Sequence, residues 1–384
     1  MAGRFINVAI EGDYVDSFIY SGTLFLVNAD SIVTTYAWEE LVDASLAKRF
    51  KPLQALGISW FLKDGRRNFS EVDWDCALII TSQELSAFAR GHLTLRGWPT
   101  DINIFSNNFY VASEFGVDRY KFDYQTKSIV VDEKLSIWDE YAYHVSPNSG
   151  QRLAIAAGNS GVITAYPRGQ YINAGDLLQT IEEPSIDCEW VDENLVSNTF
   201  TNSYLSVFSS LPSKENYSDA ASFFSSYNAA KRSANPAIPF SEFIDTTVKY
   251  AWVAGTRLFS LLSDEHLRLR IDELEIESSE GSPAFETGEL EISSESGTEK
   301  IYKARSGSFG AVIEMKNSLL LIDQESTRTL SSSAVSWRVF PRARNFLNQL
   351  HVVENNLLNI FAFEVSFPTS NNYFAIADDE TPES

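Results

Sequence analysis

The segment 23–38 reads TLFLVNADSIVTTYAW, which is an apolar run, a short polar turn and a second apolar run ending in an aromatic residue. This arrangement returns seven more times, with Ile closing some copies. The other copies are CALIITSQELSAFA (76–89), NFYVASEFGVDRYKF (108–122), RLAIAAGNSGVITAY (152–166), NLVSNTFTNSYLSVF (194–208), TRLFSLLSDEHLRLRI (256–271), GAVIEMKNSLLLI (310–322) and QLHVVENNLLNIFAF (349–363). One unit recurring every 20–50 residues or so indicates a repeat architecture.

Each copy predicts a β-hairpin. The runs alternate apolar and polar residues or form short buried stretches rich in β-branched and aromatic residues. The turns contain Asn, Asp, Ser and Gly, as in Asn28–Asp30 and Asn159–Gly161, and these residues suit tight antiparallel turns. An isolated hairpin is marginally stable in water, so the hairpins must be joined by neighbouring strands.

The dipeptides that close the copies carry a family resemblance. Five of the eight are a large apolar residue followed by an acid: Trp38-Glu39, Phe122-Asp123, Ile271-Asp272, Ile322-Asp323 and Phe363-Glu364. This position resembles the Trp-Asp pair that ends the third strand of each blade in WD40 β-propellers, whose repeat is about 40–45 residues. The Gly-His pair of that family is missing, apart from Gly91-His92, which is out of phase. The resemblance implies an all-β propeller of seven or eight blades and carries over no functional residue.

Further strands complete this picture. DSFIY (16–20), DINIF (101–105), EYAYHV (140–145), VKYAWVA (248–254) and AVSWRVF (334–340) are each suited to a first strand, and HLTLRG (92–97) to a fourth. We expect the N-terminal strand RFINVAI (4–10) to fill the last blade and remove an open sheet edge. The rival fold is two packed β-sandwiches, which also show many short strands.

The number of blades depends on one hairpin. Eight hairpins suggest eight blades, whereas seven is the commoner solution in this family. The step from Phe88 to Phe122 is short for a blade, so the hairpin at 76–89 is the one expected to belong to a neighbour. We predict one propeller domain over residues 1–370, with insertions at 39–60, 211–245 and 272–299, and an acidic tail at 371–384.

The charge balance restricts the partners. The chain has 52 acidic and 30 basic residues, a net charge of −22, which argues against nucleic acid and anionic membranes and favours partners with a basic surface. Two cysteines, Cys76 and Cys188, make no disulfide framework. The N-terminus lacks the apolar stretch of a signal peptide, and no run is long enough to span a membrane. These features predict a cytoplasmic protein.

Two insertions are expected to be helical. Residues 39–60 include EELVDASLAKRFKPLQALG, a helix-like stretch that ends near Pro52. In residues 211–245, Ser218 or Asp219 is suited to cap a helix running to about Lys231. Its residues Phe223, Phe224, Tyr227 and Ala230 would share one face. That face either packs on the flank of the propeller or contacts a partner.

The third insertion is acidic. Residues 272–299 hold ten acids and no Lys or Arg, with a near-repeat of Glu273–Glu277 at Glu289–Ser293. The alternation of Leu or Ile with Glu predicts a hairpin with one acidic face. The alternatives are a solvated hairpin, a cleavable regulatory loop, and an arm for a basic partner in which Glu275, Glu277, Glu289 and Glu291 make the contacts.

A small basic group and one tryptophan are further candidates for partner contacts. Arg338, Arg342 and Arg344 lie in SWRVFPRARNF, and Trp98 precedes Pro99. Arg and Trp are enriched in protein interfaces. The alternative for the three arginines is pairing with the protein's own acids.

No catalytic motif was found. GxxxxGK[ST], HExxH, CxxC and GxSxG patterns do not occur, and the four histidines, His92, His144, His266 and His351, lie far apart in the sequence. We therefore predict no catalytic, cofactor-binding or metal-binding residue and no cofactor. The sequence favours a non-enzymatic scaffold, adaptor, or regulatory or inhibitory subunit that binds a protein partner through loops and insertions. The alternatives are a propeller enzyme of the glycosidase or lyase type with its site in the central funnel, and a module recognising a glycan or small ligand.

Overall fold

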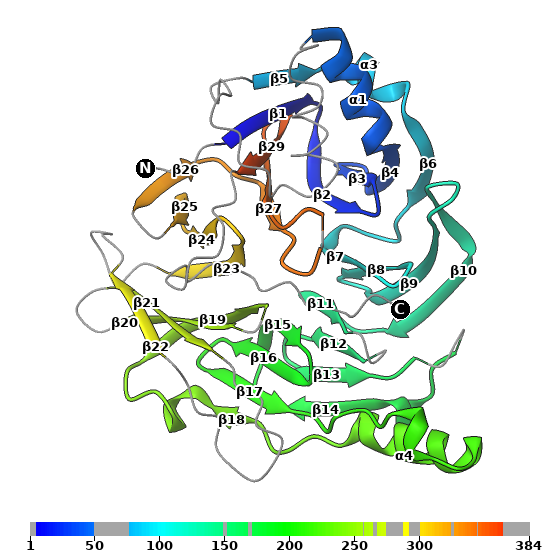
Figure 1. Ribbon diagram of the computed structural model, residues 1–384, viewed down its shortest axis with the longest axis vertical. Helices are drawn as coiled ribbons and strands as arrows, with labels where there is room; N and C mark the ends of the chain where they lie inside the picture. The colour runs from blue at the N-terminus through cyan, green and yellow to red at the C-terminus, as the bar shows by residue number, and fades with distance from the viewer. Residues whose placement is uncertain are drawn as a thin grey trace.

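The repeated hairpins are arranged as the blades of one ring (Figure 1). The computed structural model describes residues 5–49, 77–148, 152–167, 171–255, 257–263, 267–273, 287–291, 300–323, 326–343 and 345–363. The described residues form seven sheets, six of four strands and one of five. The protein is therefore a seven-bladed β-propeller. The propeller prediction is confirmed with the lower of the two blade numbers, and the alternative of two β-sandwiches is wrong.

Blades 2 to 6 are each a run of four consecutive strands, whereas β5 interrupts blade 1 and blade 7 combines strands from both parts of the chain. Blade 1 contains β2 (Tyr14–Tyr20), β3 (Thr23–Asn28), β4 (Ile32–Ala37) and β6 (Ala89–Thr94); blade 2 contains β7 (Pro99–Phe105), β8 (Asn108–Ser113), β9 (Gly116–Asp123) and β10 (Ser128–Trp138). Blade 3 contains β11 (His144–Pro147), β12 (Leu153–Ala156), β13 (Val162–Ala165) and β14 (Leu177–Ile181); blade 4 contains β15 (Ser185–Val191), β16 (Asn194–Thr199), β17 (Ser203–Val207) and β18 (Ile238–Pro239).

The second half of the ring follows the same order. Blade 5 contains β19 (Val248–Ala254), β20 (Arg257–Ser263), β21 (Leu267–Glu273) and β22 (Thr287–Glu291); blade 6 contains β23 (Ile301–Gly307), β24 (Gly310–Met315), β25 (Ser318–Ile322) and β26 (Thr327–Ser331). Blade 7 contains β27 (Ser336–Val339), β28 (Gln349–Glu354), β29 (Leu357–Phe363), β1 (Phe5–Glu11) and β5 (Ala77–Ile80). The helices are α1 (Trp38–Arg49), α3 (Ser82–Ser86) and α4 (Ala220–Arg232), with short 3-10 turns η3 (Ala174–Asp176), η4 (Lys214–Asn216) and η5 (Phe240–Glu242).

Seven of the eight predicted hairpins are the second and third strands of a blade, and their closing residues lie within two residues of the end of the third strand. The first strands of successive blades contact one another around the ring, so they are the innermost strands. Tight turns join many of the strands. Between β7 and β8, for example, Ser106 and Asn107 both have positive φ, as a two-residue hairpin turn of the favoured twist requires.

The eighth hairpin, predicted at 76–89, is wrong. Its first run forms β5, which pairs with β1 in parallel, and its second run leads into β6 of blade 1. The expected turn is instead the start of α3. Thr81 accepts a hydrogen bond from the backbone N–H of Glu84, and the Glu84 carboxylate accepts one from the backbone N–H of Thr81. This capping box initiates a helix where a hairpin turn was expected.

The N-terminal strand closes the ring, as predicted. β1 pairs antiparallel with β29 from Phe5 opposite Phe363 to Glu11 opposite Leu357. Blade 7 is therefore built from both ends of the described chain, and β5 covers the outer edge of β1. Pairing that edge satisfies backbone groups that would otherwise be exposed as an open template.

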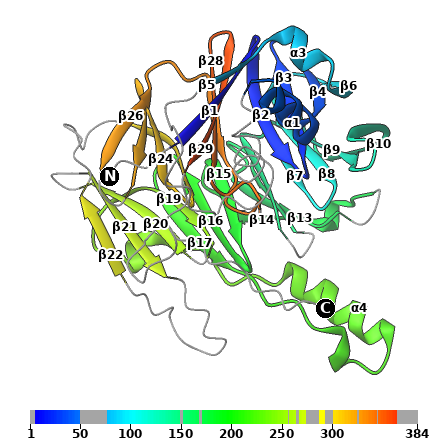
Figure 2. The ribbon, with the colours of Figure 1, turned by 45° about the horizontal axis from the view of Figure 1, so that its top comes forward.

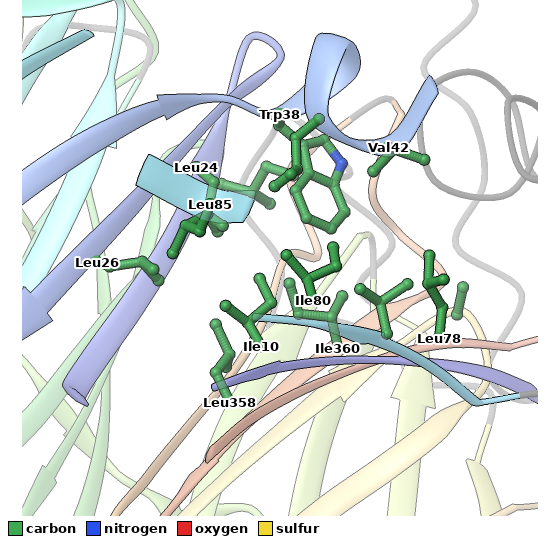
Figure 3. Close-up of a cluster of buried hydrophobic side chains, with 14 of the residues drawn as sticks. Ile10, Leu24, Leu26, Trp38, Val42, Leu78, Ile80, Leu85, Leu358 and Ile360 are labelled. Atoms are coloured by element: carbon green, nitrogen blue, oxygen red, sulfur yellow. The ribbon is translucent and has the colours of Figure 1, made fainter. Parts of the chain in front are cut away.

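A hydrophobic cluster joins this closing blade to blade 1 (Figure 3). Blade 7 contributes Ile10, Leu78, Ile80, Leu358 and Ile360; blade 1 and its two helices contribute Leu24, Leu26, Trp38, Val42 and Leu85. Trp38 is fully buried at the start of α1. Apolar residues of blade 7 and blade 1 thus pack together where the ring closes, and we call this contact the seam.

The structure describes the three predicted insertions only in part: the first two contain helices, and the acidic segment supplies a regular blade strand. The first insertion begins as α1, and its remainder from residue 50 lies outside the described residues. Asp219 caps α4 by accepting from the Ser222 N–H at 2.8 Å. In the acidic insertion, β22 is the fourth strand of blade 5. Residues 274–286, 292–299 and the tail from 364 lie outside the described residues.

Replacing Ile10 with Ala should destabilise the ring at its seam. Ile10 is fully buried in the blade 7 to blade 1 cluster, and truncating such a residue costs about 2–5 kcal/mol in unfolding free energy. Chemical denaturation measures the loss. The control Glu11→Ala changes the neighbouring exposed residue and should stay within about 0.5 kcal/mol of wild type. An Ile10→Ala protein as stable as the control would contradict closure by β1.

Candidate functional site

The innermost strands bring a ring of charged and polar side chains to the axis of the propeller. They are Asp16 on β2, Asp101 on β7, His144 on β11, Asp187 and Glu189 on β15, Tyr250 on β19, Lys303 and Arg305 on β23, and Arg338 on β27. All seven blades contribute at least one residue. We call this set the hub cluster.

An irregularity in the strands accompanies these side chains. In five of the first strands the pairing register shifts just before the hub residue: at Tyr14/Asp16, Pro99/Asp101, Ser185/Asp187, Val248/Tyr250 and Ile301/Lys303. Such a β-bulge bends the strand and changes the direction of the side chain that follows it. The repeated bulge is therefore a structural device shared by most blades, and it places one polar residue of each at the axis.

Arg338 is one centre of the hub cluster. Its Nε donates to Asp16 Oδ1 at 2.7 Å and its Nη2 to Asp101 Oδ1 at 2.9 Å. The Arg338 side chain is only 10% exposed. Burial alone would lower the pKa of Arg338, but the two carboxylates outweigh it and raise that pKa. Arg338 is thus paired with the protein's own acids, which is the alternative that the sequence left open, and its charge is not available at the surface.

Arg305 is the second centre. Its Nη2 and Nη1 donate to the two Asp187 oxygens at 2.6 and 2.9 Å, and its Nε lies 3.2 Å from Glu189 Oε2. Tyr250 donates to Asp187 Oδ2 at 2.6 Å. Burial would raise the pKa of Asp187, but Arg305 and His144 outweigh it and lower that pKa. Burial does raise the pKa of Glu189, against the effect of Arg305.

His144 connects the two centres. Its Nε2 lies 3.4 Å from Asp101 Oδ2 and its Nδ1 lies 3.5 Å from Asp187 Oδ1. Burial lowers the pKa of His144, although both carboxylates oppose this. The imidazole is therefore neutral at pH 7. A continuous path of polar contacts runs from Arg338 through Asp101, His144 and Asp187 to Arg305, crossing blades 7, 2, 3, 4 and 6.

A cavity of about 370 Å³ lies beside the hub cluster, toward the ends of the first strands. Its wall includes His144, Glu189, Lys303, Arg305, Arg338 and Arg342, together with the aromatic rings of Phe18, Phe105 and Phe340. Residues 340–343, which follow β27, and residues 345 and 346 form one side of it. The axis of this propeller is therefore charged and polar, and it has a cavity beside the ion pairs of the hub cluster.

The chemistry open to this site is limited by its ion pairs. The enzyme alternative required titratable groups to converge at the axis, and they do. However, Asp16, Asp101, Asp187 and Glu189 each lie at ion-pair distance from an arginine. Among the carboxyl and imidazole groups that line the cavity, those of Glu189 and His144 have shifted pKa values. Within the described part of the chain, no cluster of His, Cys, Asp or Glu is arranged to hold a metal ion.

The other predicted site residues are not brought together. Arg342 is exposed and spans the mouth of the cavity, where its Nη1 donates to Pro147 O and its guanidinium lies 5.5 Å from the Phe105 ring centre. Trp98 is 50% exposed. Glu289 and Glu291 lie on β22, opposite Arg270 and Arg268 in the strand pairing. Arg344, Glu275 and Glu277 lie outside the described residues.

Helix α4 carries Phe223, Phe224 and Tyr227, and it projects from the edge of the ring (Figure 2). The three rings contact one another, with centroid distances of 5.3 Å for Phe223–Phe224 and 5.5 Å for Phe223–Tyr227. None of the hydrophobic clusters formed by the described residues includes them. The rings therefore pack mainly on their own helix and not in the propeller core.

A buried arginine holds the other end of α4. Arg152, only 1% exposed, donates from Nε to Lys231 O at 3.3 Å and from Nη2 to Ala230 O at 3.1 Å and Ser209 O at 2.6 Å. A cation at the C-terminus of a helix is favoured by the helix dipole. The C-terminal carbonyls of α4 are thus tied to blade 3, while the aromatic residues lie nearer its N-terminus.

Exposed aromatic side chains gather at the opposite edge of the blades, where the first strands begin. They are Trp98, Phe115, Tyr141, Tyr143 and Phe200, each between 38% and 58% exposed. Tyr141 and Tyr143 stack edge to face at 4.7 Å, and Tyr143 lies 6.5 Å from Phe200. We call this set the aromatic arc. The prediction of a strand over 140–145 is wrong in part, because β11 begins at His144 and the two tyrosines lie in the preceding loop.

Sequence reasoning missed the hub cluster, although a signal for it was present. The predicted first strands DSFIY and DINIF open with Asp16 and Asp101, and the unassigned runs SIDCEWV (185–191) and IYKARSG (301–307) carry Asp187 and Arg305. A charged residue near the start of an otherwise apolar strand, repeated from blade to blade, would have marked a polar axis. Which acid meets which base could not be read from the sequence.

The comparisons with known proteins assign neither a family nor a function to the chain. No family model matches the chain, and no curated protein matches it. Among solved structures, it is similar to the WD40 propeller domain of Doa1 (12% identity, 96% of this chain and 94% of that one, TM-score 0.45). It is similar to the Dos1 propeller (10%, 91% and 78%, TM-score 0.47) and to the Swd1 propeller domain of Myceliophteria thermophila (12%, 70% and 97%, TM-score 0.40). No residue role is transferred from them. The helices in the described residues include none that is long and apolar enough to cross a membrane.

Replacing Asp187 with Asn should destabilise the protein strongly. Asp187 is 5% exposed and neutralises Arg305, and removing one partner of a buried ion pair costs about 3–5 kcal/mol. Urea denaturation at neutral pH gives the loss. Glu40→Gln is the control, because its pair with Arg90 is exposed, and it should cost no more than about 1 kcal/mol. Equal effects of the two substitutions would show that the hub pair has no structural role.

Stability should fall as the pH drops below about 6.5, in part because of His351. Burial, and then Arg338, lower the pKa of His351 to about 3. Between pH 6.5 and pH 3 the unfolded chain therefore carries a proton on His351 and the folded protein does not. The contribution of neutral His351 to the unfolding free energy is fully present above pH 6.5 and decreases as the pH falls. The slope is about 1.4 kcal/mol per pH unit.

The variant His351→Gln should lose less stability than wild type between pH 7 and pH 5, by about 2 kcal/mol in the unfolding free energy. Urea titrations at the two pH values measure the difference. Exposed His92 on β6 provides the control, because His92→Gln also replaces an imidazole with an amide. If His351→Gln follows wild type over this range, His351 is not the buried group responsible.

Proposed function

We propose that this protein is a non-enzymatic scaffold or regulatory subunit that binds a protein partner with a basic segment. The observation that carries the proposal is the aromatic arc, five exposed aromatic side chains on loops of three neighbouring blades. Aromatic residues supply much of the binding energy in protein interfaces. Large exposed apolar side chains grouped on one face are characteristic of interaction surfaces.

The aromatic arc is held by the backbone beneath it. A Cβ on Gly97 would lie 2.6 Å from the Phe115 ring, and one on Gly158 would lie 3.2 Å from the Tyr143 ring, so both rings rest closely on glycine. The Ala142 N–H donates to Ser113 O at 3.1 Å, which ties the loop of the two tyrosines to the turn of Phe115. Rings fixed in this way lose little conformational entropy when a partner binds.

Acidic residues surround the aromatic arc. Glu114, Asp139, Glu140 and Glu182 are exposed in the same turn and loops. Their charges would attract a segment rich in Lys and Arg. The faces of tyrosine and phenylalanine rings also bind such cations directly, and Arg96 already lies 4.9 Å from the Phe115 ring centre. A basic, extended partner segment therefore complements both the rings and their acidic surroundings.

Helix α4 offers a second contact in this proposal. Its aromatic residues Phe223, Phe224 and Tyr227 lie beyond the edge of the ring, and Arg152 anchors the helix behind them. It lies on the edge where the first strands end, because it follows the third strand β17, which runs parallel to the first. A partner large enough to contact both edges would bind at two sites, the aromatic arc and helix α4.

The test is affinity capture followed by peptide mapping. Wild type and the double variant Tyr143→Ser/Phe200→Ser are used as baits, and peptides from the captured protein are titrated by fluorescence polarisation. We expect a Lys- and Arg-rich peptide that binds wild type at least about tenfold more tightly than the variant, as loss of interface hot spots implies.

Tyr124→Ser is the matched control, because Tyr124 is 55% exposed in the turn between β9 and β10, away from the aromatic arc. It should bind the peptide like wild type. Equal binding by wild type and the double variant, or a preference for acidic peptides, would refute this role of the arc. If Phe224→Ser loses binding and the double variant does not, the peptide binds on α4 and not on the aromatic arc.

A further inference from the structure

We propose that the central cavity binds a small organic anion, a molecule with one carboxylate or phosphate group and an apolar body, held by Lys303 and Arg342. This site is distinct from the aromatic arc and does not rest on the function proposed above. The cavity lies at the ends of the first strands, and the arc lies where they begin.

The first argument is the balance of charge around the cavity. Arg338 is neutralised by Asp16 and Asp101, and Arg305 by Asp187 and Glu189. Lys303 and Arg342 have no such partner: among the described residues, no carboxylate lies at ion-pair distance from either one. Lys303 Nζ donates only to the carbonyl of Trp337 at 3.3 Å. Two positive charges at the cavity wall therefore have no carboxylate in direct contact, although Asp101 and Asp16 act on Lys303, and Glu189 acts on Arg342, from farther away.

The second argument is the composition of the cavity wall, which is basic although the protein is strongly acidic. The chain has a net charge of −22 and only 30 basic residues, yet four of them line one cavity with a single carboxylate, Glu189. Burial, followed by the charges of Arg338 and Arg305, lowers the pKa of Lys303. Holding a lysine in this place is unfavourable without an anion, and a bound anion would relieve the repulsion.

The third argument is the shape and polarity of the cavity. Its volume of about 370 Å³ lies within the range of small-molecule sites. Phe18 and Phe340 pack edge to face at 5.4 Å on its wall, and Phe105 lies beneath the guanidinium of Arg342. Asn103 and Ser146 add neutral polar groups. Charged groups combined with aromatic walls suit a ligand with an anionic head and an apolar body.

Arg342 gives the site an entrance. It lies in the exposed loop after β27 of blade 7, and it reaches across to Pro147 of blade 3 and Phe105 of blade 2. Its bond to Pro147 is to a neutral carbonyl, which an anion can replace with a stronger, charge-assisted hydrogen bond. The same residue therefore covers the mouth and contributes to binding.

The experiment is isothermal titration calorimetry at constant ionic strength with three probes: phenyl phosphate, benzoate and inorganic phosphate. We expect saturable binding of phenyl phosphate or benzoate, tighter than that of inorganic phosphate, because only the first two have an apolar body. The stronger of the two identifies the preferred head group. Lys303→Met and Arg342→Met should each weaken binding at least tenfold.

Lys300→Met is the matched control, because Lys300 is exposed and stacks on Tyr302 outside the cavity. It should bind like wild type. Thermal unfolding of each variant shows whether it is folded. If Lys303→Met is unstable, Arg342→Met still tests the proposal, because it changes only an exposed side chain. Absence of saturable binding to all three probes, or equal affinity of wild type, Arg342→Met and folded Lys303→Met, would overturn the proposal.

Discussion

The neutralisation of charge at the axis is the constraint on which the rest of this propeller depends. Moving an ion out of water is costly, and the cost is recovered only when an opposite charge is placed at hydrogen-bond distance with good geometry. Arg338 and Arg305 meet this condition with carboxylates from other blades, and His144 connects the two sets. Because every blade supplies at least one residue of the hub cluster, a shift of any blade would break buried polar contacts, and in blades 1, 2, 4, 6 and 7 it would separate buried charges. The ion pairs therefore fix the relative positions of the blades, while the apolar faces between blades provide most of the stabilising burial.

The two edges of the propeller, on either side of the hub cluster, carry different charged and aromatic groups. Where the first strands begin, loops present the aromatic arc with acidic residues around it, which suits a basic protein segment. Where the first strands end, the cavity presents Lys303 and Arg342, which suit an anion. The ion pairs of the hub cluster lie between these regions and keep the opposite charges apart. A strongly acidic protein can thus contain a cationic pocket, because four basic residues line the cavity and two of them, Lys303 and Arg342, have no carboxylate of the described residues at ion-pair distance.

Blade 7 is assembled from two distant parts of the chain. β1 pairs with β29 from Phe5 opposite Phe363 to Glu11 opposite Leu357, so this strand pairing is the most non-local among the described residues. The segment 77–94 strengthens the same region, since β5 pairs with β1 in blade 7 and β6 then pairs in blade 1. One stretch of chain therefore spans the seam, and the apolar cluster around Trp38 and Ile10 fills the space between the two blades. The hairpin expected at 76–89 was wrong because the cap at Thr81 and this demand for a bridge favour a different arrangement.

The sequence by itself determined the elements that depend on neighbours in the chain. Hairpins, their turns, the residues that end third strands, the capped helix α4 and the N-terminal closing strand all follow from local periodicity and from the need to bury apolar faces. Only the tertiary structure decided what meets across the ring. Arg338 pairs with Asp16 and Asp101, which lie 322 and 237 residues away in the chain, and Lys303 is left without a carboxylate. The physical reason is that apolar burial is non-directional and can be read as a pattern, whereas an ion pair requires two specific atoms at about 3 Å, a distance set by the closed ring and its bulges.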